Sequence, residues 1–342
     1  MFKKIREELD KGFFIPMPLL KNFLGAVGPL TFVIGKNPKA FIENIPSWKM
    51  RIKNLKPPWA HMEDERQYDS RRLLSKEDYE DLPPVRNEKY LRPTRLCESD
   101  APEIRAMAKK LWEGKESEME FVKAAYYFVK NEKKLVFKTM GGAIQAFRTK
   151  GGVCLEQLAL LAAIARAGGI PARYRLYALA PTQPMYDVMV KDNPILKQTY
   201  EMLGFLDAIH GEAELLVNGK WIALDPTFSD ELEAGMGLPV TDFGEEPMWR
   251  VRIPESDIRF EGFPILFRHF LIPVAAILRK AVDSINAKLD ELREQGREIL
   301  EDVGREEYNK KVKKSFKITV PSVSEVKAFR NAQLSVKEVG SP

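Results

Sequence analysis

The chain contains few of the residues that build cross-linked or metal-bound folds. Its 342 residues include two cysteines, Cys97 and Cys154, and three histidines, His61, His210 and His269. Two cysteines cannot form a disulfide framework, and no Cys-x-x-Cys pair is present. The closely spaced ligands that a structural zinc site needs are missing as well. We therefore expect no metal site, and a reducing, cytoplasmic setting is the simplest interpretation.

The chain also has no strong charge excess and no long apolar run. Its 54 basic residues nearly balance 49 acidic ones, so the composition does not predict nucleic-acid binding. The apolar stretch 22–35 is interrupted by glycine and proline, and the stretch 263–278 is broken by Arg268 and Pro273. Each is shorter than the roughly 20 apolar residues of a membrane-spanning helix. We interpret both as packing surfaces, with peripheral contact to a membrane interface as the alternative.

Patterning divides the chain into three regions. Residues 1–95 are an N-terminal extension and a polar, proline-punctuated connector, 96–250 hold the densest regular signals, and 251–342 form a C-terminal extension. Within the last region, apolar residues recur at helical spacing over 278–313 and predict one long amphipathic helix or a helical pair. We expect that helix to dock on the protein's own core or on a partner, and self-association of the chain is one such case.

The middle region has an order of helices first and strands afterwards. A capping box of Ser117 and Glu120 marks the start of the second helix. The third helix is apolar nearly all round and ends at a glycine pair, Gly168-Gly169. The predicted elements are helices over 100–112, 116–131 and 154–167, a strand over 170–179 and strands within 210–227.

The segment HGEAELLVNGKWIALDPT, residues 210–227, predicts a β-hairpin. Asn218-Gly219 between two strand-like runs is the strongest short-range signal for a two-residue type I′ turn. That turn fixes a register in which Glu212 lies opposite Asp225, and His210 is a diagonal neighbour of Asp225 on the same face. A histidine is therefore expected within hydrogen-bonding reach of a carboxylate. The opposite, core-facing side carries Gly211, Ala213, Leu215, Val217, Ile222 and Leu224.

Cys154 stands at the first turn of the apolar helix, directly after Gly151, Gly152 and Val153. A thiolate is the reactive form of cysteine, and the unpaired amides at a helix start favour an anion. Glycines at 151 and 152 leave no side chain where a substrate backbone would approach, and the amide of Cys154 can donate to a developing oxyanion. These features indicate a nucleophile on a rigid helix tip rather than an inert buried thiol.

The stretch GGVCLEQLALLAAIARAGGIPARYR, followed by HGEAELLVNGKWIALDPTF, resembles the transglutaminase-like superfamily of papain-like cysteine enzymes over a core of about residues 88–250. The resemblance implies an α+β, papain-like fold in which a nucleophile helix packs on a small antiparallel sheet. It also implies that Cys154 is the nucleophile, His210 the general base and acid, and Asp225 the orienting carboxylate. No metal or organic cofactor is required.

The chain departs from the family pattern at Glu212, where many members have an aromatic residue. Like charges directly opposed in a sheet are unfavourable, so an arginine such as Arg173 or Arg175 neutralises Glu212 and Asp225, or Glu212 binds an amine or cationic substrate. Two further substrate-binding candidates are Gly152 and Trp221, although Trp221 could equally cap the sheet. Candidates for a second oxyanion donor are Trp112 and Gln145.

The expected reaction is acyl transfer from a protein or peptide amide through a thioester on Cys154. Hydrolysis is favoured over transamidation because water is the default acceptor, and an amine is the alternative acceptor. Two other classes stay open. One is a catalytically silent transglutaminase-like scaffold, and the other is a membrane-peripheral interaction protein.

Overall fold

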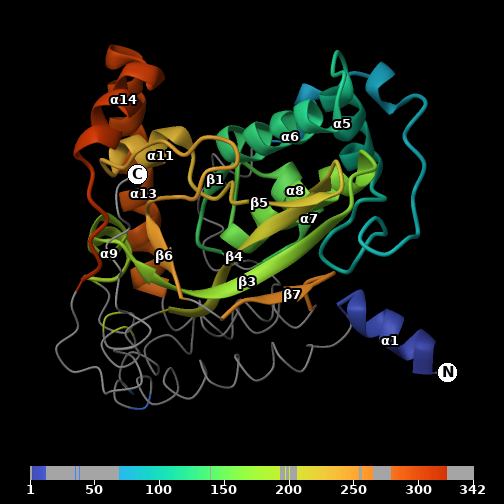
Figure 1. The fold of residues 1–342 in the computed structure, drawn as a ribbon, viewed down its shortest axis with the longest axis horizontal. Helices are drawn as coiled ribbons and strands as arrows, with labels where there is room; N and C mark the ends of the chain where they lie inside the picture. The colour runs from blue at the N-terminus through green and yellow to red at the C-terminus, as the bar shows by residue number, and fades with distance from the viewer. Residues whose placement is uncertain are drawn as a thin grey trace.

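Helices pack against one face of a small antiparallel sheet in an α+β arrangement, as Figure 1 shows for the computed structural model. Helices α5, α6, α7 and α8 gather over the sheet, while α11, α13 and α14 lie together at one end of it. The structure describes residues 2–12, 69–138, 140–192, 206–253, 256–264 and 279–321, with a few isolated positions such as Tyr200.

The main sheet is built around β3, Ala172–Pro181, a well-buried strand that pairs with β4, β6 and β7. The strand order is β5-β4-β3-β6, and β7 also pairs with β3. All of these pairings are antiparallel. A separate two-stranded parallel pair joins β1 to β2 just before the helix that begins at Cys154. The remaining strands are β1 Lys134–Leu135, β2 Gly151–Gly152, β4 Leu206–Val217, β5 Lys220–Leu224, β6 Arg250–Arg252 and β7 Ile258–Phe260.

The hairpin of β4 and β5 has the predicted turn and register. Val217 pairs with Lys220 and Ala213 with Leu224. Asn218 and Gly219 have φ angles of 50° and 76°, which is the left-handed pair that a type I′ turn requires. The predicted core face is confirmed as well, because Ala213, Leu215, Val217 and Leu224 are buried in the core and Ile222 packs against it.

Helix α8, Cys154–Ala167, runs through the centre of the helical layer. Every residue after its first is buried, including the charged Glu156 and Arg166. Arg166 satisfies its guanidinium with the backbone carbonyls of Arg92, Ala172 and Glu261. A helix that is apolar nearly all round and enclosed on all sides gives its first residue a fixed position.

The other helices agree with the sequence pattern to within two residues where one was predicted. Ser117 accepts a hydrogen bond from the amide of Glu120 at 3.3 Å, as expected for the capping box. The helices are α1 Phe2–Asp10, α5 Pro102–Trp112, α6 Glu118–Glu132, α7 Ala143–Arg148, α9 Gln183–Met189, α11 Asp230–Gly235, α13 Arg279–Val303 and α14 Arg305–Ser315, with short 3₁₀ turns at Ser70–Leu73 and Glu77–Tyr79.

The C-terminal segment is a helical pair, α13 and α14, separated at Gly304, where φ is +80°. The first part of the apolar stripe is used by the protein's own core, since Ile285, Leu289 and Leu292 are buried in it. Farther along the same helix, Val303 is 42 % exposed. Self-association through this segment stays a prediction.

Helices α11 and α13 cross at two glycines. A Cβ on Gly235 would lie 1.8 Å from the carbonyl oxygen of Leu292, and one on Gly296 would lie 1.7 Å from that of Glu231. Such close backbone approach is open only to glycine. The crossing therefore fixes how the C-terminal helix sits against the rest of the domain.

The sheet extends past residue 250, because β7 at Ile258–Phe260 pairs with β3. The predicted boundaries at residues 95 and 250 stay predictions. The stretch 22–35 and most of 263–278 lie outside the described residues. Among the residues that are described, none of the helices is long and apolar enough to span a membrane.

Lys133 is a buried lysine that joins three segments. Its ammonium donates to the backbone oxygens of Phe147 and Thr149, at 2.8 and 2.9 Å, and to the hydroxyl of Ser70. Burial, with the nearby positive charge of Lys150, lowers the pKa of Lys133 to about 7. The segment ahead of Cys154 is therefore held by a lysine whose pKa lies well below its usual range.

Replacing Gly296 with alanine should destabilise the fold, because the new methyl group collides with backbone rather than with a movable side chain. We expect a loss of about 1–3 kcal/mol in the free energy of unfolding, measured by urea denaturation. Glu298→Ala, on the exposed side of the same helix, is the matched control and should change stability little. Equal stability of both variants would contradict the close crossing.

Replacing Lys133 with methionine should change the pH dependence of stability. The folded-state pKa lies below the ordinary value, so between about pH 7 and 10.5 the unfolded chain binds the proton more tightly and wild-type stability rises with pH. As the pH rises through that window, the free energy of unfolding of wild type should therefore increase relative to that of Lys133→Met by up to about 1.4 kcal/mol per pH unit. Urea denaturation at several pH values measures it, and a pH-independent difference would contradict the assignment.

Candidate active site

Cys154 is the first residue of α8, and Glu156 fixes the start of that helix. The Glu156 carboxylate accepts hydrogen bonds from the amides of Val153, at 3.1 Å, and Gly141, and it lies 3.5 Å from the Lys138 ammonium. Burial raises the pKa of Glu156, while Lys138 and the two amides lower it. Glu156 was not found from the sequence, although an acidic residue at the third helical position is a known capping signal.

The glycine pair before Cys154 lies in close contact with other parts of the same chain. A Cβ on Gly151 would lie 2.5 Å from a Val136 methyl group, and one on Gly152 would lie 2.9 Å from a Glu156 carboxylate oxygen. Gly151 and Gly152 form β2, which pairs in parallel with β1. The space expected for a substrate backbone at Gly152 is therefore filled by the chain's own strand and carboxylate.

The strand next to this loop is held from the other side by α13. Asn286 accepts from the amide of Phe137 at 2.8 Å and donates to its carbonyl at 3.1 Å. Arg293 donates to the carbonyl of Leu135, and Lys134 pairs with Asp290 at 3.0 Å. The C-terminal helix α13 thus supports the backbone that leads to Cys154.

The Cys154 thiol lies in an environment that opposes its ionisation. The residue is half-buried and packs against both large apolar clusters of the protein. Burial and the nearby Asp225 carboxylate raise the pKa of Cys154 to about 12, while the helix-start amides of Leu155 and Cys154 lower it. The expected effect of the helix start is present, but burial outweighs it. A thiolate here needs a base to take the proton.

His210 and Asp225 form the predicted pair. The His210 Nε2 atom lies 2.7 Å from Asp225 Oδ2, and both side chains are buried. His210 stands on β4 and Asp225 follows the end of β5, so the hairpin register brings them together. With Nε2 engaged by the carboxylate, Nδ1 is the ring atom left for proton exchange.

Asp225 is held by groups that favour its charged form. The Thr227 hydroxyl donates to Oδ1 at 2.5 Å, and the Thr227 amide donates to the same oxygen at 3.2 Å. Burial would raise the pKa of Asp225, but His210, Arg250 and Thr227 together hold it well below its usual range. Gln157 of α8 donates to the carbonyls of Pro226 and Thr227, so the helix that carries Cys154 also holds this loop.

Arg250 lies beneath the His–Asp pair and was not found from the sequence. Its guanidinium is 3.4 Å from Asp225 Oδ2 and 3.3 Å from Glu212 Oε2. Arg175 contacts the other Glu212 oxygen at 3.1 Å, and Arg252 lies 3.5 Å from it. Of the two arginines proposed to neutralise Glu212, Arg175 therefore does so. Arg173, the other one, pairs instead with Glu214.

Two aromatic rings flank His210. The Trp249 ring is 4.8 Å away and nearly perpendicular, and Tyr177, the cross-strand neighbour, is 5.9 Å away. Trp249 itself stacks on Phe228 at 4.5 Å. These contacts fix the plane of the imidazole, and neither ring belongs to a motif that the sequence analysis used.

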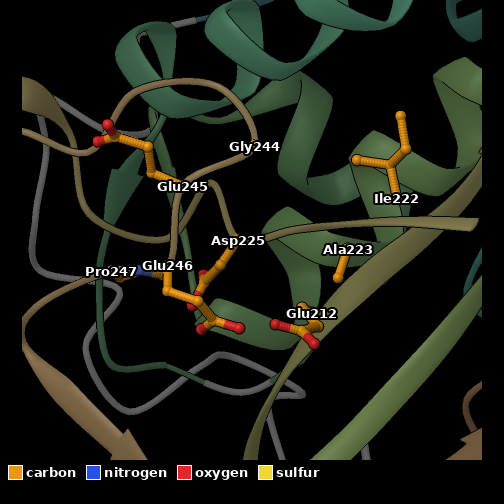
Figure 2. Close-up of a pocket in the computed structure, with 8 residues that line it drawn as sticks. All are labelled: Glu212, Ile222, Ala223, Asp225, Gly244, Glu245, Glu246 and Pro247. Atoms are coloured by element: carbon orange, nitrogen blue, oxygen red, sulfur yellow. The ribbon is translucent and has the colours of Figure 1, made fainter. Parts of the chain in front are cut away.

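A cavity of about 160 Å³ opens beside the outer end of this network. Figure 2 shows the Glu212 and Glu246 carboxylates facing each other across it, with Asp225 alongside. Glu212 lines the cavity but is already paired with arginines. Its role in binding a cationic substrate therefore stays a prediction.

Several candidates are not brought to this site. Trp221 pairs with Leu216, about 20 Å along the strand from His210, and its ring lies under Arg173. Trp112 donates to the carbonyl of Gly168 at the far end of α8, about 20 Å from Cys154, so the expectation that it serves as an oxyanion donor is wrong.

The other candidates are placed as follows. Gln145 lies against Gly141, whose amide binds Glu156, and so remains near the helix start. Cys97 is fully buried, and burial raises its pKa. His61 and His269 lie outside the described residues. In the part of the chain that is described, the histidine, cysteine and carboxylate side chains form no group suited to a metal ion.

Residues 105–226 match the family model of the transglutaminase-like superfamily. The crystal structure of "a Putative Cysteine Protease from Cytophaga hutchinsonii" is 21 % identical, with 56 % of this chain and 57 % of that one covered and a TM-score of 0.31. The chain thus spans just over half the length of that protein. Comparison with curated proteins gives no match. The family match confirms the predicted resemblance and α+β fold class, and it supports a cysteine-dependent hydrolase or transferase at a coarse level.

Asp225 should matter for Cys154 reactivity in a graded way. Asparagine keeps an acceptor for His210 but loses the charge that stabilises the imidazolium, and alanine loses both. We expect the rate of Cys154 alkylation by iodoacetamide at pH 7 to fall about tenfold in Asp225→Asn and further in Asp225→Ala. Peptide mass spectrometry measures the rate, with Cys97 in the same sample as the internal control. Unchanged alkylation in Asp225→Ala would contradict the pairing.

Proposed function

Because residues 105–226 carry a transglutaminase-like core, we propose that this chain is a cysteine-dependent enzyme that transfers acyl groups from amide or peptide substrates with a Cys154–His210–Asp225 triad. The observation that supports this most is the 2.7 Å contact of His210 Nε2 with a buried carboxylate. The same Asp225 is close enough to Cys154 to raise the thiol pKa.

In the first step His210 takes the thiol proton as Cys154 attacks the amide carbonyl. The S–C bond forms, the C–N bond breaks, and the proton passes from His210 to the leaving amine. Asp225 stabilises the transient imidazolium and does not itself take the proton. The backbone amide of Cys154, at the helix start, is the first oxyanion donor, and Gln145 is the candidate for the second.

In the second step the thioester is resolved by an acceptor. Water activated by His210 forms the new C–O bond, the S–C bond breaks, and the proton returns to the thiolate. An amine acceptor would form a new amide by the same route. We favour hydrolysis because water is the default acceptor, so the enzyme is a protease or amidase in this proposal, with transamidation as the alternative.

The experiment that tests the proposal is the pH profile of Cys154 alkylation by iodoacetamide in wild type, His210→Ala and His210→Gln. A buried thiol with a pKa of about 12 presents almost no thiolate at pH 7 unless a base removes its proton. We expect measurable wild-type alkylation at neutral pH, and a fall of at least about 100-fold in both variants. Circular dichroism checks that each variant is folded.

The second candidate function is a catalytically silent scaffold, which is favoured by the burial of Cys154. Its signature would be equally slow alkylation of Cys154 and Cys97 in wild type, with no effect of His210→Ala. That result would overturn the proposed triad. If alkylation of Cys154 depends on His210, a second experiment distinguishes hydrolysis from transamidation. A glutamine-rich protein is incubated with the enzyme and a fluorescent primary amine. Ammonia release without incorporation of the label indicates hydrolysis.

A further inference from the structure

Arg250 connects the His–Asp pair to a second buried carboxylate. Its Nε and Nη2 atoms each lie 3.4 Å from Asp225 Oδ2, the same oxygen that contacts His210. The Nη2 atom also lies 3.3 Å from Glu212 Oε2, and Nη1 lies 3.1 Å from Glu246 Oε2. One guanidinium therefore bridges the orienting carboxylate, the residue that replaces the family's aromatic, and the loop before β6.

The position of Arg250 is determined by packing as well as by charge. Its side chain is 1 % exposed, and the guanidinium lies 4.8 Å from the Tyr177 ring and 5.4 Å from the Trp249 ring. Those two rings are the ones that flank His210. A buried arginine with a fixed fork geometry can hold two carboxylates in one orientation, which a lysine cannot do.

We propose that Arg250 is a positioning residue of the site, which orients Asp225 toward His210 and, together with its counter-ion Glu212, sets the pH range in which the Cys154–His210 pair is reactive. The inference rests on the proposed function. It also accounts for the departure at position 212, because a glutamate there supplies the negative charge that a buried Arg250 requires.

Several charged and titratable groups around Arg250 act on the Cys154–His210 pair. A cation near the Cys–His pair makes loss of the first proton easier, and an anion makes it harder. Cys154 and His210 are expected to titrate as a coupled pair, so a nearby charge shifts the pKa of the pair and not that of one residue alone. The groups that face Arg250 or its partners are Asp225 after β5, His210 and Glu212 on β4, Tyr177 and Arg175 on β3, Glu246 in the preceding loop and Arg252 on β6.

These charges predict the direction in which each substitution shifts the pH midpoint of Cys154 alkylation. Arg250→Gln removes a cation, so the pH at which Cys154 alkylation rises should move upward by about one unit, which is about tenfold in reactive species. Glu212→Gln removes the counter-ion and should move the same midpoint downward. Arg250→Lys keeps the charge, so the midpoint should stay in place while the plateau rate falls through loss of the bidentate orientation.

The experiment is the pH profile of iodoacetamide alkylation at Cys154 in the full chain, for wild type and these three variants. Arg166→Lys is the matched control, because Arg166 is also buried but donates to backbone carbonyls and lies over the Tyr174 ring at the other end of α8. It should leave both midpoint and plateau unchanged. Opposite shifts for Arg250→Gln and Glu212→Gln are the result that a merely structural role would not produce.

The alkylation profiles distinguish failure of the Arg250 role from failure of the proposed triad. A His210-dependent wild-type profile, with Arg250→Gln and Glu212→Gln midpoints equal to wild type, would overturn the role of Arg250 and leave the triad intact. A wild-type profile that does not depend on His210 would overturn the triad itself. If Arg250→Gln fails to fold, the downward shift in Glu212→Gln and the unshifted midpoint in Arg250→Lys are still required.

Discussion

A buried negative charge is the constraint on which the candidate site depends. Asp225 is held ionised inside the protein by His210, Thr227 and Arg250, and each of these contacts comes from a different part of the chain. An unpaired carboxylate at this depth would be strongly unfavourable. Strand β4, the loop after β5 and strand β6 must therefore all be in place before the Asp225 carboxylate has its full set of partners.

Local signals in the sequence predicted the parts of the site that depend on local geometry. The Asn218-Gly219 turn fixes the hairpin register, and the register alone brings His210 beside Asp225. The apolar helix and its glycine stop predicted α8 closely, so Cys154 was correctly placed at its start. Arg250 could not be found in this way. It lies on a three-residue strand with no alternating pattern, and its partners are 25 and 38 residues earlier in the chain.

Gly151 and Gly152, the glycines before Cys154, are required for a different reason from the one that the sequence suggested. A glycine pair beside a cysteine suggests space for a substrate, yet here that space holds β1 and the Glu156 carboxylate. The burial of the thiol has the same origin, since tight packing around α8 both fixes Cys154 and raises its pKa. Tight packing therefore favours a fixed position of Cys154 but opposes ionisation of its thiol, and in the proposed triad His210 overcomes this by taking the thiol proton.

The support that α13 gives to the segment before Cys154 also affects the order of events during synthesis. Asn286 and Arg293 hold the backbone of Phe137 and Leu135, although about 150 residues separate them along the chain. A growing chain that has produced the whole 105–226 core still lacks these contacts, as well as Arg250. The segment before Cys154 and the Asp225 carboxylate thus gain their full set of contacts only after β6 and α13 have been synthesised.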